Sequence, residues 1–77
     1  MPERYIIIQR QPVSQPLSLE AMTQVAEEHG AKVLERVDEG ILVEMDVSDV
    51  NRLRENHPEL VIMLYGIALV IYIRSFL

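Results

Sequence analysis

The apolar residues of the chain recur with several different periods, and each period predicts one element of secondary structure. The first is a run of β-branched residues, Ile6–Ile8, that stands between charged residues. Because an unbroken apolar run is typical of a strand covered on both faces, we predict a central strand over residues 5–10. The segment 11–16 contains prolines and has no periodicity, so it is predicted to be a connecting loop.

A helix is predicted over residues 19–29. Ser18 precedes it, and serine is favoured at the position that caps the first turn of a helix. Gly30 follows as the glycine that commonly ends a helix, with His29 beside it in the last turn. The expected buried stripe has helical spacing and consists of Leu19, Met22, Val25 and Ala26.

A β-hairpin is predicted next, with strands over 32–37 and 41–45. Residues 32–37 alternate between two faces, and the apolar residues of 41–45 share one face with a glutamate on the other. Asp38–Gly40 forms the turn, because glycine accepts a positive φ. The two strands are therefore expected to be antiparallel neighbours.

A second, short amphipathic helix is predicted before Pro58. Asp46 or Ser48 can cap it, and if Asp46 is the cap, Asp49 can reach back to it in a capping box. Pro58 ends the helix, because the residue before a proline disfavours helical backbone. The expected buried stripe consists of Val47, Val50 and Leu53.

The C-terminal part of the chain is unusually apolar. The stretch 60–73 contains no charged residue, and Arg74 is the only charge after it. A membrane-spanning helix needs about 20 apolar residues, so membrane attachment is the disfavoured alternative. The β-branched residues and Gly66 favour strands, either a hairpin that turns at Tyr65–Gly66 or one long bent strand. We expect a fifth strand, whose apolar association residues are Ile67, Leu69, Ile71 and Ile73.

The length of 77 residues predicts one domain, residues 1–77, with a core over about 4–64 and an apolar C-terminal segment over 66–77. The chain has no cysteine, so packing, a partner or oligomerisation must stabilise a thin core. The N-terminus lacks the pattern of a signal peptide, and we expect a cytoplasmic location. A net charge of -5 with scattered basic residues disfavours nucleic-acid binding.

Residue types that carry catalysis or bind metals do not form a recognisable constellation. His29 and His57 each stand near the end of a predicted helix, where they could form a metal pair or supply a general base. We favour a simpler interpretation, in which each interacts with a helix C-terminus. No serine lies in a glycine-flanked turn, and no glycine-rich phosphate loop is present. We therefore expect no enzyme, no metal, no cofactor and no small-molecule substrate.

An antiparallel sheet with two helices on one face leaves its other face and its edge strands available to a partner. This apolar surface is expected to be either a docking face for another protein or the core of a homodimer, and the sequence leaves both interpretations open.

Four segments of the chain resemble the subtilisin propeptide and proteinase-inhibitor family. They correspond to an opening strand, a helix end with the next strand, a turn with the third strand, and a second helix with the start of a fourth strand. The segments are Arg4–Ile7, Val25–Val33, Asp38–Met45 and Val50–Val61. The resemblance covers residues 4–64 and implies a ferredoxin-like α+β sandwich of order βαββαβ, with an antiparallel sheet, two helices on one face and here an extra C-terminal strand.

The resemblance also implies a function. The open face of the sheet would dock on two surface helices of a subtilisin-like serine protease, and the C-terminal tail would enter the active-site cleft like a product. The tail residues are Arg74, Ser75, Phe76 and Leu77. The chain would then be an inhibitor or folding assistant of the protease. The alternative is a ferredoxin-like module that forms homo-oligomers or docks on another subunit through its apolar C-terminal strand.

Overall fold

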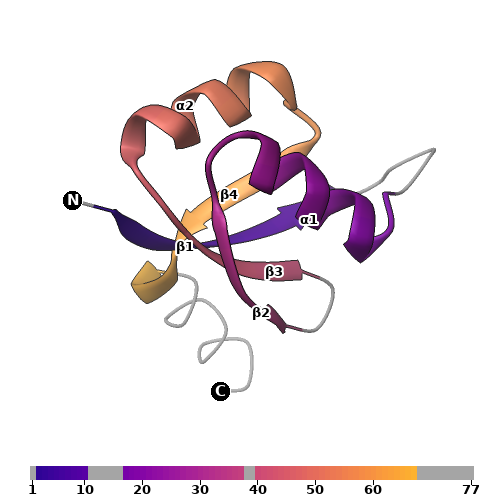
Figure 1. Ribbon diagram of the computed structural model, residues 1–77, viewed down its shortest axis with the longest axis horizontal. Helices are drawn as coiled ribbons and strands as arrows, with labels where there is room; N and C mark the ends of the chain where they lie inside the picture. The colour runs from indigo at the N-terminus through magenta and orange to yellow at the C-terminus, as the bar shows by residue number, and fades with distance from the viewer. Residues whose placement is uncertain (1, 11–16, 38–39, 68–77) are drawn as a thin grey trace.

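The computed structural model describes residues 2–10, 17–37 and 40–67. Its elements confirm the predicted α+β class (Figure 1). In chain order they are β1 (Glu3–Gln9), α1 (Leu19–Glu28), β2 (Lys32–Val37), β3 (Gly40–Met45), α2 (Val47–Asn56) and β4 (Leu60–Leu64).

The four strands form one antiparallel sheet in the order β2-β3-β1-β4. β1 lies inside the sheet, as its apolar run predicts, and Ile7 is paired with Ile41 of β3 on one side and Ile62 of β4 on the other. β2 and β3 are antiparallel neighbours, as the hairpin pattern predicts. Residues 38–39 of the predicted turn lie outside the described residues.

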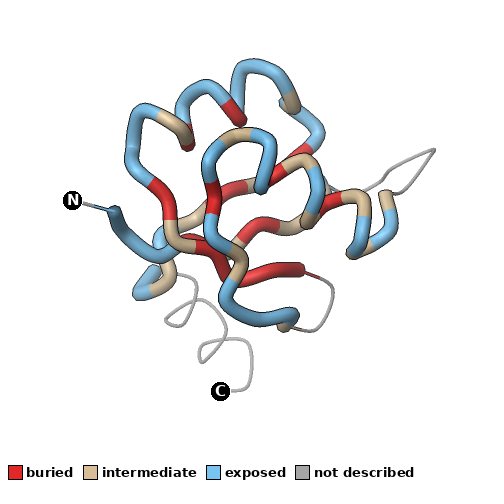
Figure 2. The backbone as a smooth tube through the Cα atoms, viewed as in Figure 1, coloured by how far each residue is buried: buried red, intermediate tan, exposed pale blue. Residues whose placement is uncertain are grey.

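Both helices contribute to one hydrophobic core on one side of the sheet (Figure 2). Directly paired residues of antiparallel strands point to the same face, so Ile7, Ile41 and Ile62 share a face. That face carries the core, together with buried residues of both helices. The largest fully buried side chains are Ile7, Met22, Ile41, Val43, Met45, Val50 and Leu53.

The start of α1 is fixed by two side chains. The Ser18 hydroxyl accepts a hydrogen bond from the backbone N–H of Ala21 at 3.1 Å, which confirms the predicted cap. The Gln9 side-chain amide, at the end of β1, accepts from the backbone N–H of Leu17 at 2.7 Å and donates to the carbonyl of the same residue. Leu17 is therefore held against the end of β1 just before the helix begins.

The end of α1 explains why a glycine occupies position 30. Gly30 has a φ of 87°, in the left-handed region that residues with a Cβ rarely adopt. A Cβ atom there would lie 2.9 Å from a carboxylate oxygen of Asp49, which belongs to α2. The glycine therefore serves both the turn after α1 and the approach of the two helices.

Asp46 is the N-cap residue of α2, as one of the two predicted alternatives has it, but its side chain makes no capping hydrogen bond. Two other predictions for α2 are wrong. The Asp49 carboxylate pairs with Arg52 instead of closing a capping box. Val47 is 64% exposed, whereas Val50 and Leu53 are fully buried. Steps of three residues turn each position by about 60° around a helix, so Val47 lies about 120° from Leu53 and misses the sheet.

The described chain leaves the sheet after Leu64. Residues 65–67 adopt helical backbone, so the prediction of one long bent strand through Gly66 is wrong. Ile67, expected at the start of a fifth strand, lies in this helical turn and is 54% exposed. The other predicted strand residues, Leu69, Ile71 and Ile73, lie outside the described residues. Within the described ranges, no helix is long and apolar enough to cross a membrane.

Candidate docking surface

The side of the sheet opposite α1 and α2, which we call the open face, is apolar at its centre. Register places its residues: Ile6 of β1 is paired with Leu42 of β3 and Met63 of β4, and Ile8 is paired with Val61. These residues alternate with those that face the core. The apolar side chains of the open face are therefore Ile6, Ile8, Leu42, Val61 and Met63.

These side chains are buried or half-buried. Leu42 is 8% exposed, and Ile6, Ile8, Val61 and Met63 are half-buried. Ile8 lies over Gly40, because a Cβ atom at Gly40 would be 2.7 Å from the Ile8 Cγ2 methyl. The glycine thus allows an isoleucine to cover β3, and the surface is continuous from β3 to β4.

Charged residues of the open face are placed at one end and along β2. Arg4 is paired with Glu44, and Glu44 with Lys32, so a row of alternating charge closes that end of the strands. Glu35 of β2 is paired with Leu42. β4 has no charged residue. The apolar centre therefore extends to the β4 side of the sheet and is bounded by charge on the β2 side.

The β2 edge is poorly suited to accept another strand. β2 carries Lys32, Glu35 and Arg36, and its pairing with β3 shifts register between Val33 and Glu35. Charges and bulges on edge strands prevent pairing with a further strand.

An arginine from α2 occupies one backbone carbonyl of the β4 edge. The backbone N–H of Arg10 donates to the Glu59 carbonyl at 2.8 Å, so these opposed residues form a hydrogen-bonded pair. Along antiparallel strands, hydrogen-bonded pairs alternate with pairs that are not hydrogen-bonded to each other. Ile7 and Ile62 form a pair of the second kind, so the carbonyl of Ile62 points away from β1, towards the free edge of the sheet. Nη2 of Arg54 donates to this carbonyl at 2.8 Å. This bond makes the β4 edge less accessible to a further strand at Ile62.

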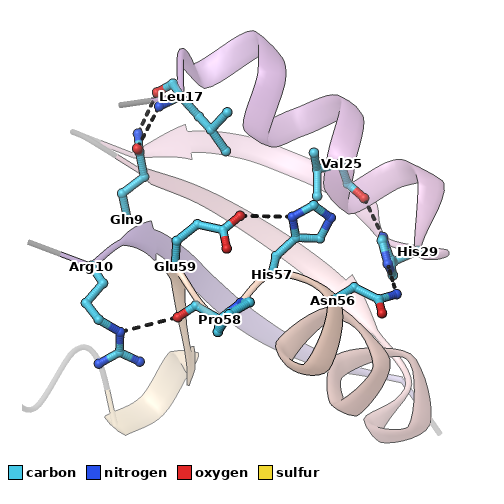
Figure 3. A network of polar contacts seen from close by, with 9 residues as sticks. All are labelled: Gln9, Arg10, Leu17, Val25, His29, Asn56, His57, Pro58 and Glu59. Carbon is cyan, nitrogen blue, oxygen red and sulfur yellow. Dashed lines mark hydrogen bonds and ion pairs between the residues drawn. The ribbon is translucent and has the colours of Figure 1, made fainter. Parts of the chain in front are cut away.

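The structure brings together two histidines that the sequence places near helix ends (Figure 3). The ring centroids of His29 and His57 are 5.4 Å apart, and the rings meet edge to face at 82°. Each histidine is the C-cap of its helix. The ring of His29 bonds a carbonyl in the last turns of α1, as the favoured interpretation expects, whereas the ring of His57 bonds the Glu59 carboxylate and no helix carbonyl. The proximity of the two rings was not predicted.

Hydrogen bonds fix both rings. Nδ1–H of His29 donates to the Val25 carbonyl at 2.9 Å, and Nδ2–H of Asn56 donates to Nε2 of His29 at 3.0 Å. Nδ1–H of His57 donates to the Glu59 carboxylate at 2.9 Å (Figure 3). A carbonyl can only accept, so His29 carries a proton on Nδ1. The pair links the ends of α1 and α2 to the residue before β4, and we interpret it as a structural clasp.

Two ionisable groups are perturbed. Hydrogen bonds from its own backbone N–H and from His57 lower the pKa of the Glu59 carboxyl below its usual value of 4.5. Burial, and then the neighbouring Glu3 carboxylate, raise the pKa of the Tyr5 hydroxyl above 10.0. Both shifts are consequences of folding, so they contribute to the pH dependence of stability.

Topology alone does not reveal the histidine pair. α1 leads from β1 to β2 and α2 leads from β3 to β4 on the same side of the sheet. Because β1 and β3 are antiparallel, the two helices run in opposite directions, and the contact of their C-cap residues depends on how the helices pack. Within the described ranges, no three His, Asp, Glu or Cys side chains are grouped so that they could share a metal ion.

The predicted tail residues Arg74, Ser75, Phe76 and Leu77 lie outside the described ranges.

Comparison with known proteins gave no match: no family model, no curated protein and no solved structure matches the chain.

Proposed function

We propose that the chain is a non-catalytic, ferredoxin-like docking domain that inhibits, or assists the folding of, a subtilisin-like serine protease. Two independent features support the proposal. The first is the resemblance of segments between residues 4 and 64 to the subtilisin propeptide family. The second is the strand order β2-β3-β1-β4 with both helices on one side, which is compatible with a ferredoxin-like sheet and leaves its other side open.

The observation that carries the proposal is the apolar character of the open face. Apolar area supplies the main driving force of association, and the half-buried side chains on this face retain apolar area that a partner can bury. Ile6, Leu42 and Met63 lie side by side on three strands and give the patch its centre. A partner with convex, apolar surface helices fits such a sheet face.

In the proposed complex the open face binds the protease and Arg74–Leu77 enters its active-site cleft as a product-like tail. β4 ends in Met63 and Leu64 without an acidic residue. The contact at this end is therefore apolar, and we expect binding to change little with ionic strength.

The test is inhibition of a panel of subtilisin-like proteases by the intact chain at micromolar concentration. We expect reversible inhibition of at least one protease, and removal of Arg74–Leu77 should weaken it by at least about tenfold, or about 1.4 kcal/mol. Proteases of an unrelated serine fold serve as the control and should be unaffected. An intact, folded chain that slows none of the panel contradicts the proposal.

A second candidate is a module that associates with its own copies. It is favoured by the absence of charge on β4, because identical surfaces that meet about a two-fold axis avoid like-charge repulsion when they are uncharged. Sedimentation over a wide range of concentration separates the candidates. A molecular mass that stays that of one chain contradicts self-association, whereas a stable dimer without protease inhibition favours it.

A further inference from the structure

The open face matches a second copy of itself about one particular two-fold axis. The strand order β2-β3-β1-β4 places two strands on each side of a line between β3 and β1. Rotation about an axis above this line and parallel to the strands places β1 of a second copy over β3, and its β4 over β2. Two sheets of equal width then meet face to face as an aligned sandwich, which is a common way for sheets to pack.

The register of β1 and β3 makes this arrangement complementary at its apolar centre. Residues paired between the two strands lie at the same height, and the rotation leaves that height unchanged. Ile6 of one copy therefore meets Leu42 of the other, and Leu42 meets Ile6. On the outer strands, Val37 of β2 meets Val61 of β4 in the same way. Apolar side chains thus meet apolar side chains on both sides of the axis.

The charged row at one end of the open face is also complementary to itself. Arg4 of one copy meets Glu44 of the other, and Glu44 meets Arg4. Packed sheets lie about 10 Å apart, a distance that these two side chains can bridge together. Within the described residues, no ion pair joins Glu44 to the cations beside it on its own sheet, Arg4 and Lys32. The second copy therefore adds a cation above each Glu44 carboxylate, and the four charges next to the axis alternate in sign.

A two-fold axis across the strands gives a poorer match. It would place β1 over β1 of the second copy, in the opposite direction. With the apolar rows in contact, Arg4 of each copy then lies opposite Arg10 of the other, and like charges that meet in an interface are unfavourable. Charge therefore selects the axis that is parallel to the strands.

We propose that the open face binds a second copy of this chain about the two-fold axis that lies between β1 and β3, parallel to the strands. This inference gives the second candidate function a defined interface, and it does not rest on protease inhibition. A protease that docks on the open face competes with the second copy. The contact is only one face of a four-stranded sheet, so we expect a weak dimer with a dissociation constant of about 1 to 100 μM.

Charge reversal tests the pairing of Arg4 with Glu44. Arg4→Glu and Glu44→Arg each replace two attractive contacts by repulsive ones, because the two-fold axis repeats every contact. Each variant alone should dimerise at least about tenfold more weakly than the parent chain. In an equimolar mixture, the acidic row of one variant meets the basic row of the other, so dimers should form again with about the parent affinity. Sedimentation velocity over roughly 1 to 200 μM measures both effects.

Two controls separate this contact from a general effect of charge. Arg52→Glu makes the same change of charge as Arg4→Glu, but on α2, on the other side of the sheet, and should leave dimerisation unchanged. Glu44→Arg lowers the net negative charge of the chain, so general repulsion predicts stronger dimers whereas the proposed contact predicts weaker ones. Denaturant unfolding first shows that each variant is folded, and Arg4→Asp or Glu44→Lys replaces a variant that is not.

A parent chain that stays monomeric over this range overturns the proposal. So does a dimer that either charge reversal leaves intact. Two variants that are monomeric alone and remain monomeric when mixed also overturn it, because the copies of the parent chain must then meet in another orientation. No protease takes part, so this result is independent of the inhibition assay.

Discussion

Arg54 of α2 donates a hydrogen bond from Nη2 to the carbonyl oxygen of Ile62 at 2.8 Å, in the middle of β4. This carbonyl points away from β1, towards the free edge of the sheet. The contact therefore does two things: it attaches the helix to the last strand, and it occupies an acceptor that another strand would need.

Replacing Arg54 with methionine should open the β4 edge. We expect a loss of about 1 to 2 kcal/mol of unfolding free energy, because the bond involves a charged donor, and an increase in concentration-dependent self-association. Denaturant unfolding and sedimentation measure the two effects. Arg52→Met is the control, since Arg52 lies on the same helix but is largely exposed and pairs only with Asp49. Equal behaviour of the two variants would rule out an edge-closing role for Arg54.

Replacing Ser18 with alanine should destabilise the protein by about 1 kcal/mol, the usual cost of losing a helix N-cap. The comparison variant is Asp46→Ala, because Asp46 occupies the same position before α2 without a side-chain capping bond. We expect it to cost less than Ser18→Ala in chemical denaturation. The reverse order would mean that the Ser18 bond to Ala21 contributes little in solution.

Alanine at Gly30 should destabilise the protein by about 1 to 2 kcal/mol, because the residue has a positive φ and a Cβ atom would crowd Asp49. Gly66 provides an internal contrast, since a Cβ atom there meets nothing within 4 Å and its backbone is helical. We expect Gly66→Ala to be neutral or slightly stabilising. Thermal unfolding of both variants checks this, and a neutral Gly30→Ala would contradict the strained geometry.

The stability of the protein should fall in acid, in part because of Glu59. Folding lowers the pKa of this carboxyl, so the folded state binds its proton less readily than the unfolded state does. Its contribution is therefore present above the usual value of 4.5 and is lost as pH falls below it. Unfolding measured between about pH 3 and pH 7 should show a smaller acid loss in Glu59→Gln than in the parent chain. An unchanged acid loss would show that other carboxyls cause it.

The sequence contains the local features of this fold in readable form. Ser18 and Gly30 mark the ends of α1 because capping depends on the residue type itself and on its immediate neighbours. Val47 shows where such patterns fail. It stands three residues before the buried Val50, yet it is largely exposed. The burial of a helical residue depends on the direction in which the whole helix faces the sheet, which the spacing of two residues does not give.

The candidate surface depends on contacts that no local pattern contains. Ile6–Ile8 is uniformly apolar, so the run itself does not show which residues face the helices and which face outward. Only pairing with β3 and β4 assigns Ile6 and Ile8 to the open face. Likewise, His29 and His57 meet because α1 and α2 pack on the same side of the sheet, and Arg54 reaches a backbone carbonyl that belongs to another element.

The central claim, that the open face is the surface that binds a subtilisin-like protease, is tested most directly by a pair of charge substitutions. Met63→Lys places a charge on the open face, and Val47→Lys places the same charge on the exposed side of α2. Both variants are first shown to be folded by denaturant unfolding, and their inhibition constants are then measured against a protease that the parent chain inhibits. We predict that Met63→Lys weakens inhibition by at least about tenfold while Val47→Lys leaves it unchanged. Equal inhibition by the two variants would contradict the account.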